Sequence, residues 1–264
     1  LAELLDPPVG VGHRLTLEPR LERANGDDQH RRVRARAGFR RYVTMDARAV
    51  SRCPRGVSLE AASAIPVAFL TAWYALQKVA KVEPGERVLI HAAAGGVGHI
   101  VVQLAKWRGA QVIGTASAGN ERFLRELGVD EFIDYRTTAF ESVARDVNVV
   151  IDAIPREVDD ATDVLARETM ARSWSVLKDG GIQVSICAHP TPGPDAAARG
   201  LRGAHAAAQP GNDVLNRVAG LVDEGKLRPD VGTVLPLRKA RRAHELIQTG
   251  HTRGKIVLRV KDLC

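Results

Sequence analysis

Cysteine, aromatic residues and long apolar runs are scarce in this chain of 264 residues. Its three cysteines, Cys53, Cys187 and Cys264, are far apart and form neither a CxxC pair nor a zinc-ligand pattern with histidine. Structural disulfides and structural zinc are therefore not expected. No apolar run has the length of a membrane span and no signal peptide opens the chain, so we expect a cytoplasmic protein with no membrane partner.

The remaining composition is that of a globular protein. Hydrophobic residues make up 45% of the chain and aromatic residues 4%, so the core must be built mostly from Ala, Val, Leu and Ile. The formal net charge of +7 suits a polyanionic small ligand. No nucleic-acid recognition motif accompanies this charge, so no nucleic-acid partner is expected.

A strand, a glycine turn and a helix follow one another at residues 87–106. Residues 87–92 are apolar and rich in branched side chains, which is typical of a central parallel strand. The pattern Ala93-x-Gly95-x-x-Gly98 then matches the dinucleotide fingerprint, with alanine at its first small position. Gly95 would admit a pyrophosphate, and Gly98 would allow close packing of the helix on the strand. S-adenosylmethionine and flavin sites also use such turns, and some glycine-rich turns bind nothing.

The end of the next strand bears on the choice of dinucleotide. An NAD enzyme carries an acidic residue about twenty positions beyond the fingerprint, where it binds the ribose 2′-hydroxyl. This chain has Thr115-Ala116-Ser117 there, and nearby polar side chains could bind a 2′-phosphate: Ser117, Asn120, Arg122, Tyr135 and Arg136. The sequence therefore favours NADP(H). The alternative for Ser117 and Arg122 is an ordinary solvated loop and helix start.

Strands alternate with helices over most of the chain. We predict strands at residues 87–92, 111–116, 131–135, 147–152 and 182–186, with a weak sixth at 201–207. We predict helices at residues 58–64, 66–80, 99–106, 120–128 and 162–177, with Ser58 as an N-cap. This order indicates an α/β fold with a doubly wound parallel sheet. After Pro210 we predict a helix at 214–224, a strand at 231–235, a helix at 237–249 and a strand at 254–260, which need not belong to that sheet.

Several ordered stretches of the chain resemble one known family. They are residues 39–43 (Phe-Arg-Arg-Tyr-Val), 54–62, 65–72, 92–98, 127–130, 133–136, 177–181, 243–245 and 250–258. From about Gly38 to Val260 the chain resembles the zinc-independent branch of the medium-chain dehydrogenase/reductase superfamily, the quinone oxidoreductase and enoyl reductase group.

The resemblance implies a Rossmann domain at residues 57–209, inserted into a partial GroES-like β-barrel domain built from residues 1–56 and 210–264. It implies NADP(H) as cofactor, a metal-free reduction of a quinone or an α,β-unsaturated carbonyl compound, and a homodimer. It also implies the cofactor-binding positions. Gly95, Gly96, Val97 and Gly98 would line the pyrophosphate, Ser117 and Tyr135 the 2′-phosphate, and Ile154, Ala188 and His189 the nicotinamide.

Two residues are candidate catalytic groups. His189 follows the fifth predicted strand and could supply a proton near neutral pH. Thr71 resembles a family threonine near the nicotinamide. The competing interpretations are an ordinary loop histidine and a threonine that bonds its own helix. His91 and His99, on either side of the glycine turn, are expected to pack or cap.

The chain departs from the family pattern before Phe39. Family members usually carry a much longer segment there, which forms most of the barrel and one wall of the active site. The sequence therefore leaves two interpretations: a shortened enzyme, or an NADPH-binding or partner-binding module that has lost efficient reduction. A cyclase or isomerase that retains the cofactor is a third. No nucleophile elbow, catalytic carboxylate pair or HExxH motif supports a hydrolase.

Overall fold

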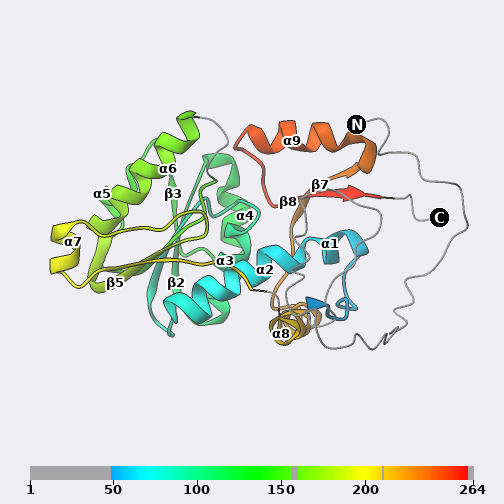
Figure 1. The fold of residues 1–264 in the computed structure, drawn as a ribbon, viewed down its shortest axis with the longest axis horizontal. Helices are drawn as coiled ribbons and strands as arrows, with labels where there is room; N and C mark the ends of the chain where they lie inside the picture. Colours follow the sequence, from blue (N-terminus) through cyan, green and yellow to red (C-terminus); the bar gives the residue numbers. More distant parts are fainter. Residues whose placement is uncertain (1–48, 156–159, 210, 261–264) are drawn as a thin grey trace, which may run out of the picture. The chain divides into compact units, whose positions relative to one another are not determined.

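The main sheet has six parallel strands in the order β3-β2-β1-β4-β5-β6. Figure 1 shows this sheet, with β2, β3 and β5 labelled. The computed structural model describes residues 49–155, 160–209 and 211–260, which all belong to one compact unit, residues 39–264. The strands are β1 (Arg87–His91), β2 (Gln111–Ala116), β3 (Glu131–Asp134), β4 (Val147–Asp152), β5 (Leu177–Ser185) and β6 (Arg202–His205). This strand order is that of the dinucleotide-binding doubly wound fold, so the predicted fold class is confirmed.

Alternate residues of the central strands enter two different cores. Val88 and Ile90 of β1 belong to one buried cluster, whereas Leu89 belongs to another. Because successive side chains of a strand point to opposite faces, the sheet is covered on both sides. The first cluster is completed by α2 (Ile65–Trp73), α3 (Gly98–Trp107), α4 (Glu121–Glu126) and α8 (Asn212–Asp223). The second is completed by α5 (Phe140–Val143), η5 (Ser173–Val176) and α7 (Pro194–Ala198).

The predicted helices are present and differ in detail, whereas α5 and α7 were not predicted. Ser58 caps α1 (Leu59–Ser63) as predicted, since its side chain accepts a hydrogen bond from the Ala61 N–H. The predicted helix at 66–80 divides into α2 and a π-helical stretch, η3 (Tyr74–Ala80), which ends at Lys81 with φ of 56°. A 3-10 turn, η4 (Ala118–Asn120), precedes α4, and α6 (Asp160–Arg172) leads into η5. No helix among the described residues is both long and apolar enough to cross a bilayer.

The fifth strand begins at Leu177, whereas the sequence predicted residue 182. In the register, Val147 pairs with Leu177 and Val149 pairs with Ile182, so residues 178–181 form a bulge in β5. Gly180 has a φ of 75°, which glycine adopts at little cost. Residues 178–180 are exposed and are either polar or glycine. The hydrophobic pattern therefore did not indicate that the strand begins before residue 182.

The last two strands form a separate parallel pair, β7 (Val231–Pro236) and β8 (Lys255–Arg259). They are connected by η6 (Leu237–Lys239) and α9 (Ala240–Gln248), because parallel neighbours need a crossover connection. The Arg259 guanidinium joins this pair to α1 through Glu60, at 3.1 Å. The family-like stretch at residues 39–43 lies outside the described residues, and the domain boundaries at 56/57 and 209/210 remain predictions.

Candidate functional site

The glycine turn, residues 92–98, connects the carboxyl end of β1 to α3. The Ala93 N–H donates to the Thr115 carbonyl at 3.0 Å, which ties the turn to β2. Ala92 is left-handed, with φ of 51°. A Cβ on Gly98 would collide with the Ala92 carbonyl oxygen and lie 2.9 Å from the Ala93 Cα. The turn can therefore close only with glycine at position 98.

Two backbone N–H groups of this turn are unpaired at the start of α3. Among the described residues, the N–H groups of Gly96 and Val97 have no hydrogen-bond partner. Val97 is the N-cap residue and provides no side-chain cap. Unpaired N–H groups at a helix N-terminus carry partial positive charge and bind anions.

The side chain of Lys255, from β8, lies next to these donors. A Cβ on Gly96 would be 3.1 Å from the Lys255 Cδ and 3.6 Å from its Nζ. Burial lowers the pKa of Lys255. Within the described ranges no carboxylate forms an ion pair with this amine. A partly buried cation beside unpaired N–H groups fits the pyrophosphate of a dinucleotide.

Lys255 was missed by the sequence analysis, although the matched stretch at residues 250–258 contains it. Its sequence position, far from the fingerprint, gave no reason to connect the two. The contact exists because the Gly254 N–H donates to the Ala94 carbonyl at 3.0 Å and so brings the start of β8 to the glycine turn.

The residues predicted for the 2′-phosphate divide into two groups. Tyr135 lies beside the end of β2, since its N–H donates to the Ala116 carbonyl at 3.3 Å. The Ser117 hydroxyl accepts from the Asn120 side chain at 3.0 Å, which leaves its own hydrogen available for an acceptor. The Arg136 guanidinium lies 5.9 Å from the Tyr135 ring centre. The structure thus brings Ser117 close to Tyr135.

Arg122 is placed differently. Its guanidinium pairs with Glu126 of the same helix at 2.9 Å, and its side chain is 92% exposed. Such an exposed pair within one helix is weak, so Arg122 would have to leave it to meet a ligand.

The residues predicted for the nicotinamide lie at the carboxyl ends of β4 and β5. The Ile154 N–H donates to the Asp152 carboxylate at 3.1 Å, and the Ala188 N–H donates to the Ser185 hydroxyl at 3.1 Å. The exposed His189 ring has its centre 4.5 Å from that of His205, the last residue of β6. Ligands of doubly wound sheets bind outside this edge.

His205 was also missed by the sequence analysis, which placed no candidate on the weak sixth strand. Its Nε2 lies 3.4 Å from the Ile186 carbonyl oxygen, which can only accept, so this nitrogen carries a hydrogen. The parallel pairing of β5 with β6 is what brings the two histidines together. A histidine at a strand end was the one signal that could have found it.

Thr71 and His91 form hydrogen bonds within the fold. The Thr71 hydroxyl donates to the Val67 carbonyl of its own helix at 2.8 Å. His91 is 1% exposed, and its nitrogens lie 3.2 Å from the Thr115 hydroxyl and 3.0 Å from the Ser173 hydroxyl. Burial, aided by Arg172 and opposed by Glu141, lowers the pKa of His91 to about 3. His91 packs, as expected.

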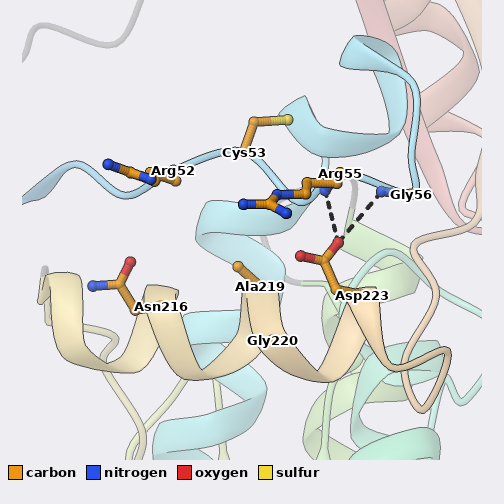
Figure 2. A pocket seen from close by; sticks show the side chains of 8 residues that line it. All are labelled: Arg52, Cys53, Arg55, Gly56, Asn216, Ala219, Gly220 and Asp223. Atoms are coloured by element: carbon orange, nitrogen blue, oxygen red, sulfur yellow. Dashed lines mark hydrogen bonds between the residues drawn. The ribbon is translucent and has the colours of Figure 1, made fainter.

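A cavity of about 640 Å³ lies between residues 52–56 and α8, away from the glycine turn (Figure 2). On the α8 side it is lined by the small residues Ala219 and Gly220. The Asp223 carboxylate accepts from the N–H groups of Arg55 and Gly56, at 2.7 and 3.3 Å (Figure 2). None of its lining residues belongs to the predicted site. Within the described residues no group of three or more His, Cys, Asp or Glu is arranged to hold a metal ion.

Comparisons with known proteins agree with this arrangement. Residues 127–258 match the family model of zinc-binding dehydrogenases. The polyketide synthase GfsB of Streptomyces halstedii is 36% identical over 233 residues, 84% of this chain and 4% of that protein. A probable mitochondrial zinc-binding oxidoreductase of Arthroderma benhamiae is 30% identical over 248 residues, 89% of this chain and 73% of that protein.

Solved structures of the same superfamily superpose on the chain. The quinone oxidoreductase from Coxiella burnetii has a TM-score of 0.68 and 36% identity, covering 78% of this chain and 62% of that one. The CurK enoyl reductase has a TM-score of 0.66 and 30% identity, covering 78% and 64%. The strand order and the glycine turn define an α/β protein with the fold of dinucleotide-binding domains. The chain belongs to the zinc-binding dehydrogenase family, in the medium-chain dehydrogenase/reductase superfamily. It spans less than two thirds of these two solved chains and a small fraction of the polyketide synthase.

Proposed function

We propose that this chain is an NADPH-dependent reductase of quinones or α,β-unsaturated carbonyl compounds that uses no metal. One observation carries the proposal: the Lys255 amine lies against Gly96, beside the unpaired N–H groups of Gly96 and Val97. A cation and two backbone donors at the carboxyl end of β1 would hold a dinucleotide pyrophosphate. Family membership supports the same cofactor class.

The preference for NADPH rests on the end of β2. Ser117 stands where a carboxylate would repel a 2′-phosphate, and its hydroxyl hydrogen is available because Asn120 donates to its oxygen. Tyr135 and Arg136 lie beside the same strand end. A hydroxyl and a guanidinium are suitable donors for phosphate oxygens, so this corner favours the phosphorylated dinucleotide.

Reduction by this route needs a hydride and a proton. A bound reduced nicotinamide supplies a hydride to the polarised C=C bond or the quinone. The chain would orient the ring with the backbone of Ile154 and Ala188 at the ends of β4 and β5. His189, exposed at the same edge and in contact with His205, would supply the proton. Thr71 is the second candidate, although its hydroxyl bonds the helix here.

Chemistry and the relatives together support the proposed substrate class. The names of two similar structures mention quinone and enoyl reduction, and a matched polyketide synthase supports an enoyl thioester as the natural form. In each of these substrates a carbonyl polarises the bond that accepts hydride, so positioning rather than a metal can activate it.

The test is NADPH oxidation by the purified chain with a panel of quinones, enones and enoyl thioesters, with NADPH affinity measured in parallel. We expect turnover with at least one class, unchanged by a metal chelator. NADPH binding without any turnover would contradict the reductase and favour the non-catalytic module. Product formation without added NADPH would favour a cyclase or isomerase. Loss of turnover with chelator would contradict zinc independence.

A further inference from the structure

The ring of His99, in the first turn of α3, bonds two parts of the chain. Its Nδ1 lies 2.7 Å from the Gly95 carbonyl oxygen, and its Nε2 accepts the Asp230 N–H at 3.1 Å. A carbonyl oxygen can only accept, and a backbone N–H can only donate. The ring, which is fully buried, must therefore be neutral, with its hydrogen on Nδ1.

The bond to Asp230 continues to Lys255. The Lys255 N–H donates to the Asp230 carbonyl at 2.8 Å, and the neighbouring Gly254 N–H donates to Ala94 at 3.0 Å. Gly254 has φ of 60°, and a Cβ there would be 2.5 Å from the Asp230 carbonyl oxygen. A closed ring of contacts thus runs from the glycine turn through His99 and Asp230 to β8 and back to the turn.

We propose that His99 is a positioning residue for the dinucleotide: it fixes Asp230 relative to Gly95 and so holds the Lys255 amine in front of Gly96. The inference rests on the proposed function, because it assumes a pyrophosphate at this turn. The His99 ring is fully buried and therefore not exposed to a ligand. We attribute its effect on binding to the position of Lys255.

The arrangement also depends on the charge of the ring. An imidazolium would place an Nε2 hydrogen against the Asp230 N–H and break that bond. The charged groups that face the ring are the Asp230 carboxylate and the Lys255 amine, and the Phe123 ring lies 6.4 Å away. Burial is the largest influence and lowers the pKa of His99, so the bridging form is the stable one at neutral pH.

Gln103, one turn further along α3, offers a matched control. Its side chain donates to the Arg228 carbonyl at 3.0 Å and accepts the Arg228 N–H at 2.9 Å. It thus holds the same returning segment as His99, with similar bonds. Its amide also donates to the His99 carbonyl at 2.9 Å within α3, but unlike the His99 ring it has no bond to residues 92–98 of the glycine turn. Removal of Gln103 should affect stability without displacing Lys255 from Gly96.

The experiment compares His99→Gln and His99→Asn with Gln103→Met, each alone and combined with Lys255→Met. Dissociation constants are measured for NADPH, for NADH and for adenosine 2′-monophosphate, which lacks a pyrophosphate. We expect both His99 variants to weaken the two dinucleotides about tenfold, the effect of one hydrogen bond of ~1.4 kcal/mol. Binding of adenosine 2′-monophosphate should stay within about twofold, and the His99 effect should disappear in the Lys255→Met background because the two act as one unit.

Any of three results for the His99 variants would overturn the inference: unchanged dinucleotide binding in both variants, an equal loss for adenosine 2′-monophosphate, or an undiminished His99 effect in Lys255→Met. The same pattern in Gln103→Met would also overturn it, as a sign of general destabilisation. If one of the two His99 variants does not fold, dinucleotide binding by the other variant tests the inference. Wild-type protein that binds neither dinucleotide would instead contradict the proposed function itself.

Discussion

Lys255 and Gly96 face each other across the start of α3, with 3.6 Å between the Lys255 Nζ and the position of a Cβ on Gly96. They are far apart in the sequence: Gly96 lies in the turn after β1 of the main sheet, and Lys255 lies in β8 of the separate strand pair. Replacing Lys255 by Met should weaken NADPH binding by about tenfold to a hundredfold, because a charge-assisted bond to phosphate contributes ~1.5–3 kcal/mol. Titration of the intrinsic fluorescence with NADPH would measure this loss of affinity.

Lys226→Met is the control for that variant, since Lys226 pairs with Glu224 at 2.7 Å on the surface. It should bind NADPH as wild type does. Equal losses in both variants would mean that the effect is one of general charge.

The charge of Lys255 also predicts a pH dependence. Burial lowers its pKa, and a deprotonated amine no longer attracts phosphate. Dinucleotide affinity should therefore fall as the pH rises through a value below 10.5, and Lys255→Met should not show this fall. Calorimetric titrations from neutral to alkaline pH would follow it. An identical profile in the variant would assign the titration to another group.

Ser117→Asp tests the choice of dinucleotide. A carboxylate beside Tyr135 and Arg136 would repel the 2′-phosphate and could accept a ribose hydroxyl. NADPH affinity should fall by about tenfold or more, while NADH affinity should fall little or rise. Ser142→Asp, on the exposed surface of α5, is the matched control. An equal loss for NADPH and NADH would refute the assignment of Ser117.

Gly98→Ala tests the closure of the glycine turn. Its Cβ would overlap the Ala92 carbonyl, and backbone atoms cannot move away cheaply. The free energy of unfolding should fall by about 2–3 kcal/mol, measured by urea denaturation. Gly220→Ala should instead raise it, by up to about 1 kcal/mol, since that helical position has no atom within 4 Å of its Cβ. A tolerated alanine at position 98 would contradict the packing described here.

His91 should make the protein less stable in acid. Its pKa is about 3 when folded and 6.5 when unfolded, so the unfolded chain binds more protons between these values. The stability that neutral His91 contributes is complete above pH 6.5 and is lost as the pH falls, at up to ~1.4 kcal/mol per pH unit. The free energy of unfolding should differ less between pH 5 and pH 7 in His91→Gln than in the wild type. His251→Gln, which replaces an exposed histidine, should show the same difference as the wild type. Equal slopes in wild type and His91→Gln would exclude this source.

Much of the nucleotide-binding fold could be predicted from the sequence. The strand at 87–92 and the turn through Gly98 are local, because the burial of consecutive apolar residues and the closure of a tight turn depend on neighbours in the chain. β2 and β4 were predicted with their observed limits for the same reason. The bulge at residues 178–181 could not be predicted, since only its pairing with β4 makes those polar residues part of a strand.

The sequence by itself determined the local pattern of a dinucleotide turn, through the glycines at positions 95 and 98, and the absence of an acid at Ser117 led us to propose NADP(H). Tertiary structure decided which side chains complete it. Lys255 and Asp230 are distant from the turn in the sequence, and the hydrogen bonds at Ala94 and His99 bring them to it. His205 carries no motif, and the pairing of β5 with β6 brings it beside His189. Steric constraints act between neighbouring residues and therefore appear as a local sequence motif. A charged side chain can contact its ligand from any position in the chain, so no local motif indicates it.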